Sequence, residues 1–287
     1  MRLLLSLTVL ALLFTTVSMA QEAPPVWKKA LTGKVSATQA GFNNWAAGGI
    51  NTLALTSGID GKAEKTDGAW TQVYDFRAGF GFIKQDTLDV RKAEDLILFN
   101  GALKYQGQQF FRLFNPTVAV SARSQFWEGF NFDKDPFSQG RRPPIKVSDA
   151  LAPATLSQSL GLTYGPAPWF TQRFGLQAKQ TIVRIERLRT LYSLRPDQGF
   201  KNEIGLEWVS ALDRDVFENV RYRSSLGIFA AFGSASKPDV LWENFVAMKV
   251  NDWLTMNFEW AVLLDEDRSK SVQVKEVFSI GLAYQFI

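Results

Sequence analysis

The chain has 287 residues and a formal net charge of +4, and it contains neither Cys nor His. Disulfides, thiolate chemistry, Ser-His hydrolysis and His-ligated metal sites are therefore excluded. Lys and Arg are scattered without a basic block, which argues against nucleic-acid binding, and the sequence predicts no cofactor.

The first twenty residues have the pattern of a secretory signal peptide. Met1 and Arg2 give a positive start, an apolar run follows, and Ser18-Met19-Ala20 supplies the small residues that a signal peptidase reads. We expect cleavage after Ala20, a short periplasmic lead over residues 21–30, and one barrel domain over residues 31–287. After the signal peptide, no apolar run is long enough for a transmembrane helix.

A tight turn is predicted within the first hairpin. Asn and Gly tolerate positive φ, and Trp favours a membrane interface. An alternative is that the Trp gates a passage or binds a ligand. The residues of this turn motif are Asn43, Asn44, Trp45, Gly48 and Gly49.

About twelve segments alternate between large apolar residues and a second face of Gly, Ser, Thr, Gln and charged residues, most weakly in the first hairpin. Such alternation is typical of β-strands, whose successive side chains point to opposite sides. The clearest apolar faces are Trp70, Tyr74, Phe76, Phe80 and Phe82; Leu156, Leu160, Leu162 and Tyr164; and Leu254, Met256, Phe258, Trp260, Val262 and Leu264.

Alternation by itself fits a soluble sheet with its apolar face inward or a transmembrane barrel with that face toward lipid. The segments are long, about ten to fourteen residues, and aromatic residues lie near their ends, as in membrane barrels. Gly and Ala on the second face suit the inside of a curved wall. We therefore predict an all-β fold, a single antiparallel transmembrane β-barrel of about 12 strands with a polar lumen.

The lengths of the connections also fit a membrane barrel, in which short periplasmic turns alternate with longer outer loops. Short turns are expected over residues 107–110, 165–169, 212–216 and 251–253, and long loops over residues 127–149, 184–199 and 233–240. Residues 60–68 form an exception, because this link is long for a periplasmic turn. Val250 and Leu254 should pair across a three-residue turn, since both belong to the apolar face.

Charged residues recur on the face predicted to line the lumen. Charges of opposite sign on neighbouring strands stabilise pairing, and Glu207 with Arg221 or Arg223 is the pair expected first. The lining is either a structural network that fills a narrow interior or a selectivity lining for a pore. The candidates are Asp75, Arg77, Arg173, Lys179, Glu203, Glu207, Arg221, Arg223, Glu243, Lys249, Glu259 and Lys275.

Catalysis has little support in the sequence. The outer-loop carboxylates Glu128, Asp133, Asp135 and Asp149 form no recognisable motif, although paired carboxylates can hydrolyse glycosides. In the same loop, adjacent arginines at 141 and 142 are either solvated or contact lipopolysaccharide phosphates.

The C-terminal strand alternates up to the end of the chain, with one residue, Ile287, after the last aromatic. Its polar, Gly and aromatic positions resemble the C-terminal signal of bacterial outer-membrane barrels, which implies recognition by the barrel assembly machinery. The residues that carry this assembly signal are Ser279, Gly281, Tyr284 and Phe286.

Two further stretches, residues 39–49 (QAGFNNWAAGG) and 242–251 (WENFVAMKVN), resemble an uncharacterised outer-membrane barrel family of Bacteroidetes-type bacteria. The resemblance covers roughly residues 27–287. It implies the fold and the location but no activity.

We therefore expect a narrow passive channel or a structural protein of the outer membrane, with lipid, lipopolysaccharide and the assembly machinery as partners and small solutes as possible cargo. The alternatives are a periplasmic ligand-binding β-barrel or sandwich and an outer-membrane surface enzyme.

Overall fold

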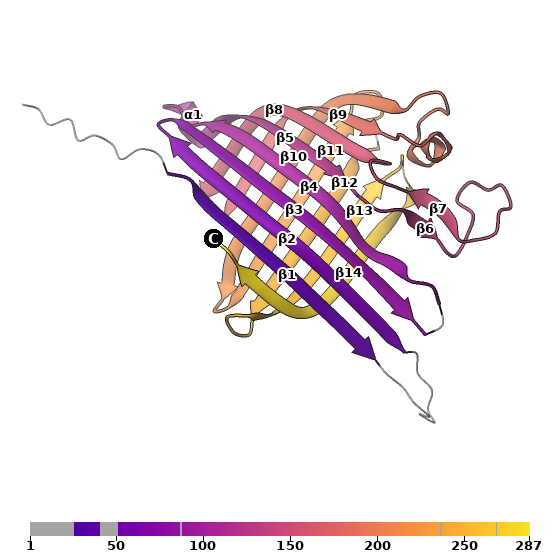
Figure 1. The fold of residues 1–287 in the computed structure, drawn as a ribbon. Coiled ribbons are helices and arrows are strands. Elements are labelled where there is room, and N and C mark those ends of the chain that lie inside the picture. The colour runs from indigo at the N-terminus through magenta and orange to yellow at the C-terminus, as the bar shows by residue number, and fades with distance from the viewer. Residues whose placement is uncertain (1–25, 41–50, 87, 236, 268) are drawn as a thin grey trace, which may run out of the picture.

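The protein is one closed antiparallel β-barrel of twelve strands, seen in a computed structural model that describes residues 26–40, 51–86, 88–235, 237–267 and 269–287. Around the barrel the order is β1-β14-β13-β12-β11-β10-β9-β8-β5-β4-β3-β2 (Figure 1). The strands of the barrel are β1 (Lys28–Ala40), β2 (Thr52–Asp67), β3 (Trp70–Gln85), β4 (Arg91–Tyr105), β5 (Phe114–Ser124), β8 (Ala154–Ala167), β9 (Phe170–Ile182), β10 (Phe200–Phe217), β11 (Val220–Ala231), β12 (Asp239–Lys249), β13 (Leu254–Asp265) and β14 (Ser269–Gln285).

The remaining elements are short and lie in the connections. They are α1 (Phe110–Leu113), the hairpin strands β6 (Gly129–Asn131) and β7 (Ile145–Ser148), and the 3₁₀ helix η1 (Glu186–Tyr192). Among the described residues, no helix has the length and apolarity required to cross a bilayer.

The apolar faces of the strands point outward and the polar faces point into the lumen. Leu160 is 63% exposed and Phe174 is 54% exposed, whereas Lys179 and Glu207 are only 8% and 5% exposed. A soluble sheet has the reverse arrangement, because its apolar face forms the core. The closed sheet and its outward apolar face fit a transmembrane barrel and not the sandwich or soluble ligand-binding barrel considered as the alternative.

The two ends of the barrel differ in the way that was predicted. One end has tight connections, such as the two residues between β8 and β9 and the two between β10 and β11. The other end has the long loops over residues 125–153 and 183–199, which contain β6, β7 and η1 (Figure 1). The link between β4 and β5 contains α1 and is longer than the predicted turn.

Several predicted turn positions are wrong. Residues 60–68 are not a loop, because β2 continues to Asp67 and turns at Gly68, whose φ of 55° suits glycine. The turn expected over residues 212–216 lies further along, because β10 reaches Phe217 and the turn includes Asn219 with a φ of 63°. Asn tolerates this left-handed conformation better than most residues.

The turn between β12 and β13 was predicted correctly. Lys249 pairs with Thr255, and the Val250 amide donates a hydrogen bond of 2.9 Å to the Leu254 carbonyl. At the start of the barrel, β1 begins at Lys28, inside the segment predicted as a lead. Residues 1–20 and the turn motif at Asn43, Asn44, Trp45, Gly48 and Gly49 lie outside the described residues.

The barrel closes where β1 meets β14, and this pairing is short. It runs from Thr32 opposite Gln285 to Ser36 opposite Gly281. Both strands continue beyond it, since β1 pairs with β2 as far as Ala40 and β14 pairs with β13 from Ser269. In Figure 1 the two strands diverge past this seam.

Gly281 is required for this closure, because a side chain there would collide with β1. An added Cβ would lie 2.5 Å from both the Ser36 Cβ and the Val35 carbonyl oxygen. We predict that Gly281→Val abolishes the closed barrel, measured as loss of the fast-migrating folded band in unheated gel electrophoresis. Gly227→Ala is the matched control, because its added Cβ meets only the Leu241 oxygen at 3.9 Å. A folded Gly281→Val band at the normal yield would contradict the role of Gly281.

Candidate functional site

The lumen is the candidate site, and it is lined by ion pairs between neighbouring strands. Arg173 on β9 donates to the Glu207 carboxylate on β10 at 2.8 Å. Lys179 lies 3.5 Å from Glu203, directly opposite it in the β9–β10 register. In each pair, a cation and a carboxylate on neighbouring strands both face the lumen and contact each other. The attraction partly offsets the free-energy cost of removing both charges from water.

A second set of contacts crosses the lumen. Arg123 on β5 donates to the Glu243 carboxylate on β12 at 3.0 Å through two guanidinium nitrogens. Because β5 and β12 are separated by four strands in the barrel order, this contact spans the interior. Lys179 on β9 likewise contacts Asp239 on β12. These contacts narrow this part of the lumen.

An inward phenylalanine at the middle of the barrel is covered by cations. Phe245 on β12 is 8% exposed. The Arg223 guanidinium lies 4.4 Å from its ring centroid, and the Lys34 ammonium lies 4.7 Å from it on the side of β1. Cation–π attraction thus stabilises an aromatic ring inside a polar lumen. Lys34 also contacts Asp60, which accepts from Arg77 at 3.2 Å.

Two cavities with both charged and apolar side chains in their linings lie among the described residues. The first, of about 80 Å³, lies at mid-height behind the seam and includes Ser36, Gly281 and Arg223 in its lining. The second, of about 250 Å³, lies toward the long loops and includes Arg123 and Lys275. Glu94 lines both and lies 3.6 Å from Lys275, so the cavities adjoin.

The predicted pairing of Glu207 with Arg221 or Arg223 is wrong. Glu207 lies opposite Phe229 in the register and contacts Arg173, while Arg221 donates to Asp213 at 2.6 Å. The error follows from the misplaced turn, because moving the turn from residues 212–216 to residues 218–219 shifts every opposing pair on β10 and β11.

The other predicted lining residues are distributed along the whole length of the lumen. Asp75 lies opposite Lys62, and Glu259 lies opposite Phe245. Lys249 is at the short-turn end, where it contacts Asp252 at 2.8 Å. Sequence reasoning missed Lys34, Asp60, Arg123 and Asp239, which lie in poorly alternating or misassigned segments, and Phe245, whose apolar side chain gave no sign of facing inward.

The residues that the sequence predicts as an assembly signal lie on β14 or just after it. Ser279 and Gly281 face the lumen beside the seam, and Tyr284 and Phe286 are exposed with their rings 5.0 Å apart. The Phe286 amide donates to the Leu31 carbonyl at 2.8 Å, which extends the contact with β1. The signal residues therefore coincide with the strand that closes the barrel.

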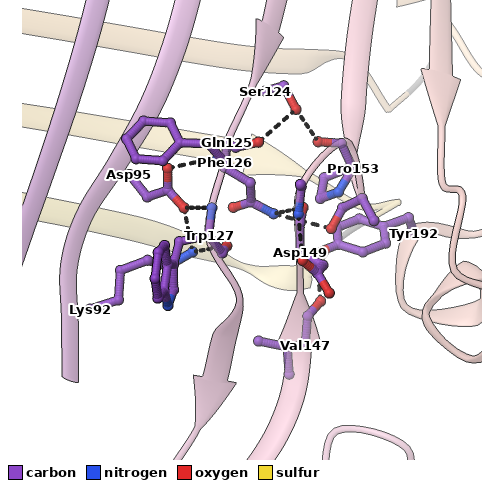
Figure 2. A network of polar contacts seen from close by, with 12 residues as sticks. Lys92, Asp95, Ser124, Gln125, Phe126, Trp127, Val147, Asp149, Pro153 and Tyr192 are labelled. Atoms are coloured by element: carbon purple, nitrogen blue, oxygen red, sulfur yellow. Dashed lines mark hydrogen bonds and ion pairs between the residues drawn. The ribbon is translucent and has the colours of Figure 1, made fainter. Parts of the chain in front are cut away.

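The long loops are held against the barrel by a polar network (Figure 2). The Asp95 carboxylate on β4 accepts from the amides of Phe126 and Trp127, at 2.9 and 2.8 Å, and from Lys92. The Gln125 side chain donates to the Asp149 carbonyl at 3.1 Å. One carboxylate thus fixes the start of the loop that follows β5.

The same loops share a small apolar core outside the barrel wall. Ala152, Val183, Leu188 and Leu194 are buried together, and Phe137 packs against them. The Tyr192 hydroxyl donates to the Val147 carbonyl at 2.9 Å, which joins η1 to β7 (Figure 2). These contacts tie the loop of residues 125–153 to that of residues 183–199.

The loop carboxylates are engaged in structural contacts. Lys146 donates to Asp149 and, at 2.9 Å, to Glu128. The hydrogen bond from Lys146 lowers the pKa of Asp149, and the same contact raises the pKa of Lys146. Asp135 accepts backbone amides of its own loop, from Phe137 and two later residues. Within the described part of the chain, no group of three or more His, Cys, Asp or Glu residues could hold a metal ion.

Comparisons with known proteins find a match to a family model over part of the chain and several similar barrels. Residues 37–130 match a family described as a protein of unknown function (DUF3078). No curated protein matches. An outer membrane channel from Pseudomonas putida F1 is 10% identical, with a TM-score of 0.40 over 92% of this chain and 96% of that one.

The translocator domain of the autotransporter NalP from Neisseria meningitidis is 9% identical, with a TM-score of 0.38 over 93% of this chain and 90% of that one. The NanC porin is 8% identical, with a TM-score of 0.34 over 89% and 97%. The geometry of the barrel, rather than these similarities, supports the functional argument.

The buried and exposed ion pairs should differ in their effect on stability. The Glu207 side chain is 3% exposed, so Arg173→Ala leaves a buried carboxylate without its partner and should lower the free energy of unfolding by about 3 kcal/mol. Arg221→Ala breaks a half-exposed pair and should cost about 1 kcal/mol or less. Urea unfolding in lipid vesicles, followed by Trp fluorescence, measures both. Equal effects would contradict the assignment of Arg173 as the partner of Glu207.

The Asp95 network should control the order of the outer loop. We predict that Asp95→Ala exposes residues 125–153 to added protease, because two amides and one ammonium lose their acceptor. Limited proteolysis of the detergent-solubilised protein, with cleavage sites read by mass spectrometry, measures the change. Asp89→Ala, at an exposed position before β4, is the control. Unchanged cleavage in Asp95→Ala would show that Asp95 is not required to hold the loop.

Proposed function

We propose that the protein is an integral barrel of the bacterial outer membrane that conducts only small solutes through a narrow, charged lumen. The observation that carries this proposal is the combination of two adjoining cavities lined in part by charged side chains with ion pairs that cross the interior, above all Arg123 with Glu243. A lumen of this kind admits water and small polar molecules but leaves no room for a wide pore.

Membrane insertion is supported by the outer surface of the barrel. Exposed apolar side chains follow the outward face of nearly every strand. At the short-turn end aromatic rings gather, as in Trp70 with Tyr105 at 4.9 Å and Phe114 with Tyr164 at 5.2 Å. Near the long loops, Phe80 packs against Phe126 and Trp127. Aromatic girdles at two levels are typical of barrels that span a bilayer.

The location in the outer membrane rests on the sequence. A signal peptide cleaved after Ala20 would deliver the chain to the periplasm, and the C-terminal signal would bring it to the barrel assembly machinery. Outer-membrane lipid and lipopolysaccharide would then surround the apolar face. The long loops, which carry the arginines at 141 and 142, would face outward. Catalysis is not part of the proposal.

Planar-bilayer recording tests the channel. We expect small, discrete conductance steps for the native protein and larger steps for the double variant Arg123→Ala/Glu243→Ala, which removes a contact across the lumen. Arg195→Ala in an exposed loop is the control and should keep the native conductance. Electrical silence of both the native protein and the double variant would refute a channel and leave a structural barrel.

A further inference from the structure

Two charged residues of opposite sign enter the mid-lumen cavity without a direct ion pair. Arg223 and Glu259 both line the cavity of about 80 Å³. Among the described residues, neither has an ion-pair partner, in contrast to Arg77, Asp60 and Lys34 in the same lining. A charge that is removed from bulk water without a partner is costly. Opposite charges such as Asp60 for Arg223 and Arg77 for Glu259 act on these residues only beyond ion-pair distance. A bound molecule could give each of them a direct partner.

The register fixes how these two residues face each other. Arg223 lies opposite Phe245 and Phe245 lies opposite Glu259, so the three residues form one row across β11, β12 and β13. Neighbouring strands lie about 4.8 Å apart, which places the Cα atoms of Arg223 and Glu259 about 10 Å apart. Their side chains point into the same cavity, with the Phe245 ring between them.

The charge balance of the cavity selects the kind of ligand. Its lining contains three cations, Lys34, Arg77 and Arg223, and three carboxylates, Asp60, Glu94 and Glu259. An added anion would meet Glu259, and an added cation would meet Arg223. A net-neutral molecule that carries one charge of each sign satisfies both residues and keeps the lining balanced.

The size of the cavity selects the smallest such molecules. A volume of about 80 Å³ exceeds the roughly 10–15 Å³ that a single ordered water requires on the same measure, so the cavity has room for a small molecule of a few heavy atoms. Glycines at positions 58, 79 and 281 contribute to this space, because they present no side chain to it. A bulky zwitterion such as a phospholipid head group with its glycerol exceeds this room.

We propose that this cavity is a binding subsite for small α-amino acids, with the carboxylate of the ligand at Arg223 and its ammonium group at Glu259. The inference deepens the proposed channel, because it names a class of solute that the lumen would select. Arg223 would donate to the carboxylate as a charge-assisted, two-pronged contact. Phe245 would form the apolar floor between the two ends of the ligand.

Binding to the purified, detergent-solubilised protein tests the subsite without reference to conductance. The probe is L-alanine, and the matched controls are propionate, which lacks the ammonium group, and ethylamine, which lacks the carboxylate. We expect saturable alanine binding by calorimetry or ligand-observed NMR, with each control about tenfold or more weaker. Propionate or ethylamine binding as tightly as alanine would overturn the proposal, as would absence of saturable binding.

Variants separate the two ends of the site. Arg223→Gln should weaken alanine binding about tenfold to a hundredfold and abolish the preference over ethylamine, and Glu259→Gln should abolish the preference over propionate. The exchange Arg223→Glu/Glu259→Arg keeps the charge balance and should restore much of the affinity. Arg195→Gln is the control. Unchanged alanine affinity in folded Arg223→Gln and Glu259→Gln proteins would refute the site.

Liposome swelling separates this inference from the channel itself. Alanine binding without any solute-driven swelling would mean that the channel proposal fails and the subsite stands. Swelling that is equal for alanine, propionate and ethylamine, without binding, would mean that the channel stands and the subsite fails.

Discussion

A chain that crosses hydrocarbon as strands must pair its backbone amides and carbonyls within the protein, because lipid supplies no hydrogen bonds. This requirement explains the closed sheet, the long strands and the tight turns at one end. It also explains why the seam between β1 and β14 depends on glycine at position 281. The strands approach each other there too closely for a side chain, so closure depends on a glycine that is also part of the predicted assembly signal.

Because the barrel closes with its apolar face outward, its polar and charged side chains are buried in the lumen and must be stabilised there. In a soluble protein, apolar side chains fill the interior, whereas here the interior receives Lys179, Glu207 and Asn257 as buried residues. Buried charges of this kind require ion-pair or hydrogen-bond partners. Lys179 and Glu207 find such partners on adjacent strands, and Lys179 also finds one across the barrel. The pair of Arg123 with Glu243 therefore has two consequences, since it compensates charge and also narrows the passage.

The sequence was sufficient for the architecture because alternation is a local property. The faces of β8, β9 and β13 could be read residue by residue, and the turn after Val250 followed from parity. Register was not accessible in the same way. A strand such as β10 that continues a few residues past its expected end changes every opposing pair, and this is why Glu207 was assigned the wrong partner. Contacts across the lumen, such as Lys179 with Asp239, depend on barrel size and have no local signal.

The outer loops are stabilised differently from the strands of the barrel wall. They lie outside the membrane-spanning strands, so the hydrophobic effect in water can act on them. Ala152, Val183, Leu188 and Leu194 form a buried cluster at that end, and Asp95 fastens the loop of residues 125–153 to β4. This cluster draws on the loop before β8 and the loop after β9, and the pairing of these two adjacent strands brings the loops together. The barrel, in contrast, is closed by backbone pairing that involves neither loop.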